Sequence, residues 1–152
     1  FGSAEGELSN LRKAMKPFAR AKTPEGKISR TLLKVAERVL VGEMAARRGQ
    51  YDVGIQALRE AVQLEASLPY SEPPFWLQPV RHNLGAVLLL AGRPAEAEAV
   101  YLEDLRINPE NGWALHGLTQ SLRSQNKGAT QEETRFQAAW AQADVTLTGS
   151  RF

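Results

Sequence analysis

The side chains that could do chemistry in this chain are few and scattered. Its imidazoles are His82 and His116, and it has no cysteine. A catalytic or metal site would need carboxylates or further imidazoles converging on these two rings. The acidic neighbours Glu96 and Glu98 point apart on a helix, which argues against paired acid–base carboxylates. We therefore expect a protein that is not an enzyme, with no metal site and no cofactor.

The composition is that of a globular chain without a membrane span. Of the 152 residues, 43% are hydrophobic and 24% are charged, which are ordinary fractions for a folded domain. The longest apolar run, residues 86–91, falls far short of the ~20 residues that cross a bilayer. The opening "FGSAEGELSN" contains no signal peptide and looks like a cut end. These features favour the cytoplasm and leave the periplasm open.

Positive charge is concentrated near the start of the chain. Between Asn10 and Lys34 the local net charge is +7, although the whole chain carries only +2. The cations are Arg12, Lys13, Lys16, Arg20, Lys22, Lys27, Arg30 and Lys34. Such a segment could bind nucleic acid or an anionic surface, but its only aromatic residue is Phe18 and it has no Gly-rich phosphate loop. The alternative is that these residues form the solvated faces of two helices.

Apolar residues recur at helical spacing throughout, and the alternation typical of strands is absent. Thr23-Pro24 predicts a helix start, and Pro17 should interrupt a short first helix. The Pro-rich residues 69–79 cannot be helical. The remaining breaks predict helices over residues 24–48, 51–67, 79–91, 94–107, 112–124 and 130–144, with residues 146–152 as a tail. We therefore expect an all-α fold.

Glycine recurs inside these predicted helices at equivalent places. Gly42 and Gly49 are seven residues apart, as are Gly85 and Gly92. A glycine within a helix costs about 1 kcal/mol relative to alanine, so a recurring one should have a packing reason. The expected reason is the close approach of two helix axes, with a small residue on one helix facing a large residue on the other.

This pattern resembles the tetratricopeptide repeat, a 34-residue helix–turn–helix unit. Residues 78–111 match it best through "NLGAVLLLAGRPAEAEAVYLEDLRINP", and residues 35–68 and 112–145 resemble two further repeats. Asp104 departs from the family, which usually has alanine at that position. The resemblance implies a right-handed α–α superhelix of about three helix pairs within residues 28–145. Residues 1–27 would be an extra, basic helical segment left from an upstream repeat.

A narrower resemblance comes from "GEMAARRGQYD" and from the segment that starts at "SEPPFWLQPVRHNLG". Both resemble the C-terminal repeat region of bacterial tetratricopeptide proteins of undefined function. The ending "ADVTLTGSRF" resembles the natural C-terminus of those proteins. This resemblance implies that upstream repeats are missing from the chain.

Stacked repeats form a concave groove lined by the first helix of each pair. The family register places these partner-binding candidates in it: Glu43, Arg47, His82, Asn83, Trp113, His116, Gln120 and Arg123. Trp113, His116 and Arg123 would make an aromatic and cationic patch suited to a peptide or a carboxylate. The alternative for Trp113 is core packing. Only one of five groove positions, Asn83, matches the family members that clamp chaperone C-terminal carboxylates, so we do not expect that ligand.

Three aromatic residues lie in the Pro-rich segment 69–79, namely Tyr70, Phe75 and Trp76. They could contact a partner as exposed anchors, or they could cover the junction between two repeats. The favoured function is a non-catalytic scaffold that binds an unknown protein or peptide in its groove. Alternatives are nucleic-acid or anionic-surface binding through residues 10–34, and a regulatory appendage of a larger enzyme. Self-association is also open, because a truncated solenoid exposes an apolar end.

Overall fold

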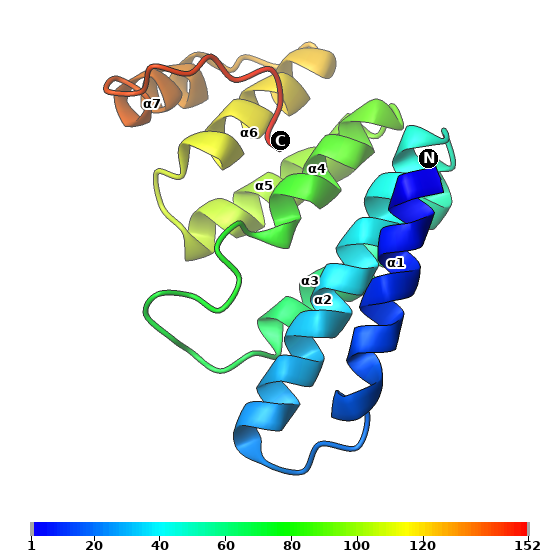
Figure 1. Ribbon diagram of the computed structural model, residues 1–152. Helices are drawn as coiled ribbons and strands as arrows, with labels where there is room; N and C mark the ends of the chain where they lie inside the picture. Colours follow the sequence, from blue (N-terminus) through cyan, green and yellow to red (C-terminus); the bar gives the residue numbers. More distant parts are fainter. Residues whose placement is uncertain (1, 152) are drawn as a thin grey trace. The chain divides into compact units, whose positions relative to one another are not determined.

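The computed structural model describes residues 2–151, and all regular structure within them is helical (Figure 1). Seven α-helices and one short 3-10 helix follow one another in these residues, without a strand. Their bounds are α1 (Gly2–Met15), η1 (Lys16–Phe18), α2 (Pro24–Arg47), α3 (Tyr51–Ala66), α4 (Val80–Leu90), α5 (Pro94–Ile107), α6 (Gly112–Ser124) and α7 (Thr130–Ala139). The expected all-α fold with packed neighbouring helices is confirmed. The chain divides into two compact units, Phe1–Val80 and Arg81–Phe152.

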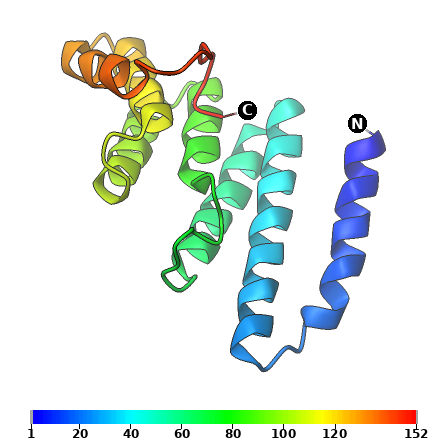
Figure 2. The same ribbon diagram turned by 60° about the vertical axis from the view of Figure 1, so that its left-hand side comes forward.

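The first unit contains α1, α2 and α3, and its helix boundaries follow the predicted signals. The Thr23 hydroxyl accepts a hydrogen bond from the Gly26 amide at 3.2 Å, so Thr23 caps α2 as expected. At the other end Gly49 takes a φ of +73°, a left-handed conformation that glycine adopts easily. α3 then returns antiparallel along α2 (Figure 2). The predicted interruption at Pro17 takes the form of η1.

Glycines allow α2 and α3 to approach closely. A Cβ atom built on Gly42 would lie 2.6 Å from Cγ of Leu58, whose side chain is buried. A Cβ on Gly54 would lie 2.9 Å from the Gly42 carbonyl oxygen. Both distances are shorter than van der Waals contact, so only glycine fits. The predicted reason for these glycines is therefore confirmed in this helix pair.

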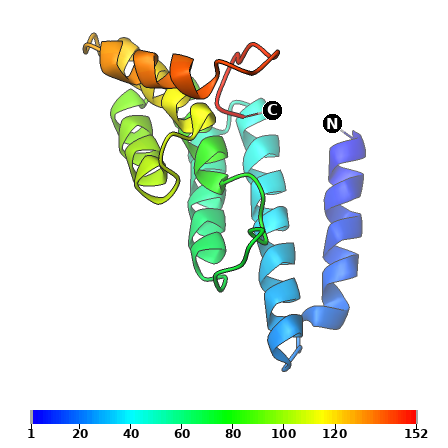
Figure 3. The same cartoon turned by 90° about the vertical axis from the view of Figure 1, so that its left-hand side faces the viewer.

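α1 packs more loosely, because none of its described residues is buried. It lies alongside α2 on the side away from α3, as the three ribbon views show together (Figures 1, 2 and 3). Two ion pairs hold it there, Arg12 to Glu37 at 2.7 Å and Glu5 to Arg48 at 2.5 Å. Exposed ion pairs contribute at most about 1 kcal/mol each. α1 is therefore the least anchored helix of this unit.

The second unit contains α4 to α7, and one tyrosine organises its core. Tyr101 of α5 is fully buried, and its ring lies between glycines of two other helices. A Cβ on Gly85 in α4 would lie 2.3 Å from Cζ of Tyr101, and one on Gly117 in α6 would lie 2.2 Å from it. Asn111 caps α6 by accepting a hydrogen bond from the Trp113 amide at 3.0 Å. The predicted packing of small residues against a large one therefore connects α4, α5 and α6 in this unit.

One expectation about the end of the chain was wrong. α7 ends at Ala139 with Trp140 as its C-cap, and does not continue to residue 144. The predicted tail is anchored, because Ser150 is only 1% exposed and its hydroxyl donates to the His82 carbonyl oxygen at 3.0 Å. Figure 1 shows these last residues running back from α7 past α6. The partner of Ser150 lies 68 residues earlier, beyond the reach of any local sequence pattern.

The helices of the described residues do not include a membrane span. No helix formed by residues 2–151 combines the length and the apolarity needed to cross a bilayer.

Candidate partner-binding surface

Four of the predicted groove residues share one face of α6. Trp113, His116, Gln120 and Arg123 are three or four residues apart, which places them one above another along a helix. The first three are half-buried and Arg123 is exposed. We call these four residues the α6 face. It combines an aromatic ring, an imidazole, an amide and a guanidinium.

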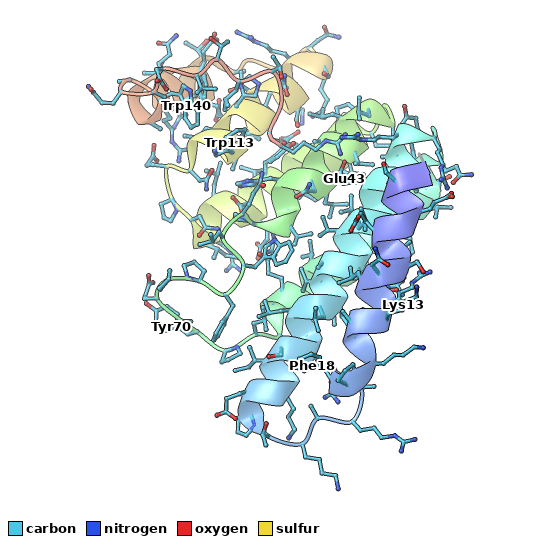
Figure 4. The ribbon with its side chains drawn as sticks, in the orientation of Figure 1. Lys13, Phe18, Glu43, Tyr70, Trp113 and Trp140 are labelled. Carbon is cyan, nitrogen blue, oxygen red and sulfur yellow. The ribbon has the colours of Figure 1, made fainter. Side chains whose placement is uncertain are left out.

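α7 covers part of the α6 face with two aromatic side chains. The Trp113 and Trp140 rings meet edge to face with their centroids 5.5 Å apart, as Figure 4 lets the reader follow. Phe136 stacks on Trp140 at 5.9 Å and meets the His116 ring at 5.2 Å. Trp113 thus has a packing role and is also partly exposed. Phe136 and Trp140 were not predicted as site residues, although two aromatics four residues apart share one helix face.

His116 is poised as a neutral imidazole. Burial, and to a smaller extent the nearby positive charge of Arg123, lower the pKa of His116 below its ordinary value. Its Nε2 atom is buried and has no hydrogen-bond partner within the described part of the chain. The hydrogen-bonding capacity of this nitrogen is therefore unused within the described residues.

Arg123 supplies the cation of the α6 face. Its guanidinium donates to Glu133 Oε1 on α7 at 2.6 Å, and both side chains remain well exposed. Such an exposed pair is held weakly, at about 0.2–1 kcal/mol. A carboxylate from a partner can therefore exchange with Glu133.

His82 does not belong to an accessible surface, contrary to its assignment as a groove residue. It is 1% exposed, and its Nε2 atom lies 3.0 Å from Asp104 Oδ2. The other Asp104 oxygen accepts a hydrogen bond from Asn108 at 3.2 Å. Asp104 thus serves as the buried partner of His82. The neighbouring Asn83 is half-buried and makes interactions of its own.

Two buried hydroxyl groups, those of Tyr101 and Ser150, form a chain of hydrogen bonds near the start of α4. The Tyr101 hydroxyl lies 2.5 Å from Ser150 Oγ, and Ser150 donates to the His82 carbonyl oxygen. A carbonyl oxygen can only accept a hydrogen bond, so the Ser150 hydroxyl proton lies in the bond to His82. The Tyr101 hydroxyl therefore donates to Ser150 Oγ. Burial raises the pKa of Tyr101 far above its ordinary value, and the Asp104 charge adds to this rise. Tyr101 therefore stays protonated as a hydrogen-bond donor.

The remaining predicted site residues lie in the first unit. Glu43 is half-buried and Arg47 is exposed on α2. In the Pro-rich loop, Tyr70 is 88% exposed and donates to Glu72 at 2.7 Å. Phe75 is also exposed, and Trp76 is half-buried. Glu43 and Tyr70 are labelled in Figure 4. The structure describes these residues within their own unit, separately from the α6 face.

No metal site emerges among the described residues, because no group of three or more His, Asp or Glu side chains gathers in one place. No family model, curated protein or solved structure matches the chain.

Proposed function

We propose that the chain is a non-catalytic protein-interaction module that binds a peptide or protein segment on the α6 face. The observation that carries this proposal is the α6 face itself, where Trp113, His116 and Arg123 bring a ring edge, a neutral imidazole and a cation together. Aromatic and arginine side chains dominate the energetics of protein interfaces. A partner segment with an acidic residue beside an apolar one complements this set.

The scaffold under this surface is a tetratricopeptide-like right-handed superhelix in our proposal. Support comes from the glycines at equivalent repeat positions, Gly42 and Gly85, which each face a large residue of the following helix. Positive φ at Gly49 and Gly92 repeats at the ends of the corresponding helices. Repeated packing of this kind holds surface residues rigidly, which reduces the entropy lost on binding.

The test is affinity capture from host lysate with two charge-reversal variants. Arg123→Glu removes the cation of the α6 face, and Gln120→Ala can be added to it without touching the core. The matched control is Arg106→Glu, since Arg106 of α5 also forms an exposed pair, with Glu103 at 2.8 Å. We expect a partner that wild type and Arg106→Glu retain and Arg123→Glu loses. Identical captures by all three chains would contradict the proposal.

A second function is favoured by a basic cleft between α1 and α2. It has a volume of about 410 Å³ and is lined by Arg12, Met15, Lys16, Ala19, Arg30, Leu33 and Lys34. Arg12 is paired with Glu37, and Arg30 donates to the Ala19 carbonyl. Within the described residues Lys16 and Lys34 form no ion pair. These two ammonium groups can bind an anion, which supports the alternative of a nucleic-acid or anionic-surface binder.

Salt dependence tests this second function. Binding of a fluorescent oligonucleotide, or of vesicles containing anionic lipid, should weaken steeply between about 50 and 200 mM salt. Lys16→Glu combined with Lys34→Glu should abolish it. Lys27→Glu is the control, because Lys27 belongs to the basic segment and does not line the cleft. Equal losses in all variants would indicate diffuse attraction without a site.

A further inference from the structure

The last residues of the chain are held by the Val145 carbonyl, which accepts a hydrogen bond from the Trp140 indole N–H at 2.7 Å, and more deeply by Ser150. Residues 141–146 are exposed, whereas Ser150 is almost completely buried and makes two hydrogen bonds. Arg151 beside it is half-buried, and burial lowers its pKa. An exposed segment that ends in one buried residue resembles a bound peptide that is covalently linked to its own binding site.

Ser150 can reach the Tyr101 hydroxyl because Gly85 and Gly117 leave room for the Tyr101 ring between their helices. A Cβ on Gly85 would lie 2.6 Å from the Tyr101 hydroxyl oxygen, and one on Gly117 would lie 2.5 Å from the ring atom Cε1. The hydroxyl therefore emerges between α4 and α6, where it meets Ser150. With the His82 carbonyl oxygen it forms a donor and an acceptor that a single hydroxyl can satisfy at once.

We propose that the Tyr101 hydroxyl and the His82 carbonyl form a recognition site for an extended peptide that carries a small hydroxyl side chain. Residues 145–151 are its intramolecular occupant, and a partner segment with the same chemistry displaces them. This inference rests on the proposed function, because it assigns the module a second contact point and a resident competitor. We call this point the hydroxyl seat.

Size and hydrogen bonding select the occupant of the hydroxyl seat. Ser150 is buried on all sides, so a longer side chain does not fit. Alanine would fit but would leave the buried Tyr101 hydroxyl without its acceptor. An unsatisfied buried donor typically weakens binding about tenfold to a hundredfold. Serine is therefore preferred over both alanine and leucine.

The covalent connection to α7 determines how strongly residues 145–151 compete with a free peptide for the hydroxyl seat. A short covalent connection gives an effective concentration on the order of millimolar. A free peptide of equal intrinsic affinity therefore binds weakly while the chain's own Ser150 occupies the seat. Removing the resident hydroxyl should expose the seat to the free peptide.

The experiment uses the full chain and a fluorescent peptide of residues 145–152, VTLTGSRF. Ser150→Leu should release the segment, seen as faster digestion by carboxypeptidase than in wild type, while the helical circular dichroism is kept. By fluorescence anisotropy, the peptide should bind the Ser150→Leu chain at least tenfold more tightly than wild type. Adding Tyr101→Phe, which keeps the ring and removes the hydroxyl, should weaken this binding at least tenfold.

Three results would overturn the inference. The first is a Ser150→Leu chain whose C-terminal segment resists carboxypeptidase as well as wild type does. The second is a Ser150→Leu chain whose C-terminal segment is released but which does not bind the added peptide. The third is equal binding of a control peptide with leucine in place of the serine. None of these readouts involves Arg123, so failure of the α6 face to capture a partner leaves this test intact.

Discussion

At the scale of single residues, the glycines facing Tyr101 decide how closely the helices of the second unit pack. Gly117→Ala would place a methyl group 2.2 Å from the ring, which is held from both sides and cannot move away. Overpacking of this kind costs about 1–3 kcal/mol, against a gain of about 1 kcal/mol from alanine in a helix. We expect a net loss in the free energy of unfolding, measured by urea denaturation.

The control for this change is Gly128→Ala. Nothing lies within 4 Å of a Cβ built there, and Gly128 is not among the glycines with positive φ. Its effect should stay within about 0.5 kcal/mol. Comparable losses from both substitutions would show that Tyr101 does not require the glycine.

The buried His82 and Asp104 pair allows a second prediction at this scale. His82→Leu leaves a buried carboxylate short of one partner, which should cost about 1–3 kcal/mol or more. Replacing both residues, as His82→Leu with Asp104→Ala, removes the unsatisfied carboxylate. We expect the double variant to lose less stability than the two single variants together, in a double-mutant cycle from urea melts. Strict additivity would show that the pair is not coupled.

At the scale of elements, α7 is held to α6 by aromatic contacts. Trp140 meets the Trp113 ring, and its indole N–H donates to the Val145 carbonyl at 2.7 Å. Trp140→Ala should cost about 2 kcal/mol, less than the ~3–5 kcal/mol of a fully buried aromatic. Hydrogen exchange should quicken in Thr130–Ala139 and stay unchanged in Tyr51–Ala66. Faster exchange in both helices would contradict a local role.

The contact between α6 and α7 should also depend on pH through His116. Its pKa is lowered in the folded chain by burial first and by Arg123 second, so the unfolded chain takes up the proton at the higher pH. Stability is therefore fully present above about pH 6.5 and declines as the pH falls through that value. Between about pH 7.5 and 5.5 the wild-type melting temperature should fall more than that of His116→Gln. Parallel decreases would assign the effect to other groups.

At the scale of the whole molecule, exposed apolar side chains concentrate in the Pro-rich loop. Tyr70 and Leu77 are 88% and 80% exposed. Replacing both by serine should change the free energy of unfolding by less than about 0.5 kcal/mol. Leu58→Ala, at a fully buried position between α2 and α3, should cost about 2–5 kcal/mol by the same urea measurement. A large loss from the loop variant would mean that these side chains have a structural partner.

The sequence by itself determined where most helices begin and end, because the deciding interactions are local. Thr23 and Pro24 start α2, Pro94 starts α5, and the left-handed glycines at 49 and 92 follow the helices that they end. The glycines within helices likewise predicted close packing, since a residue without a side chain has one common use there. The candidate residues of the α6 face followed from the resemblance to the tetratricopeptide register, and their helical spacing puts them on one face.

Only the tertiary structure decided which of these residues are accessible and which partners they have. His82 meets Asp104 across 22 residues, Tyr101 meets Ser150 across 49, and Trp113 meets Trp140 of α7. The breaks in the sequence predicted a helix to residue 144, but α7 ends at Ala139, where Trp140 contacts Trp113 and Val145. Hydrogen bonds and ring contacts between distant residues depend on how the helices pack, and no local pattern of residue types encodes that packing.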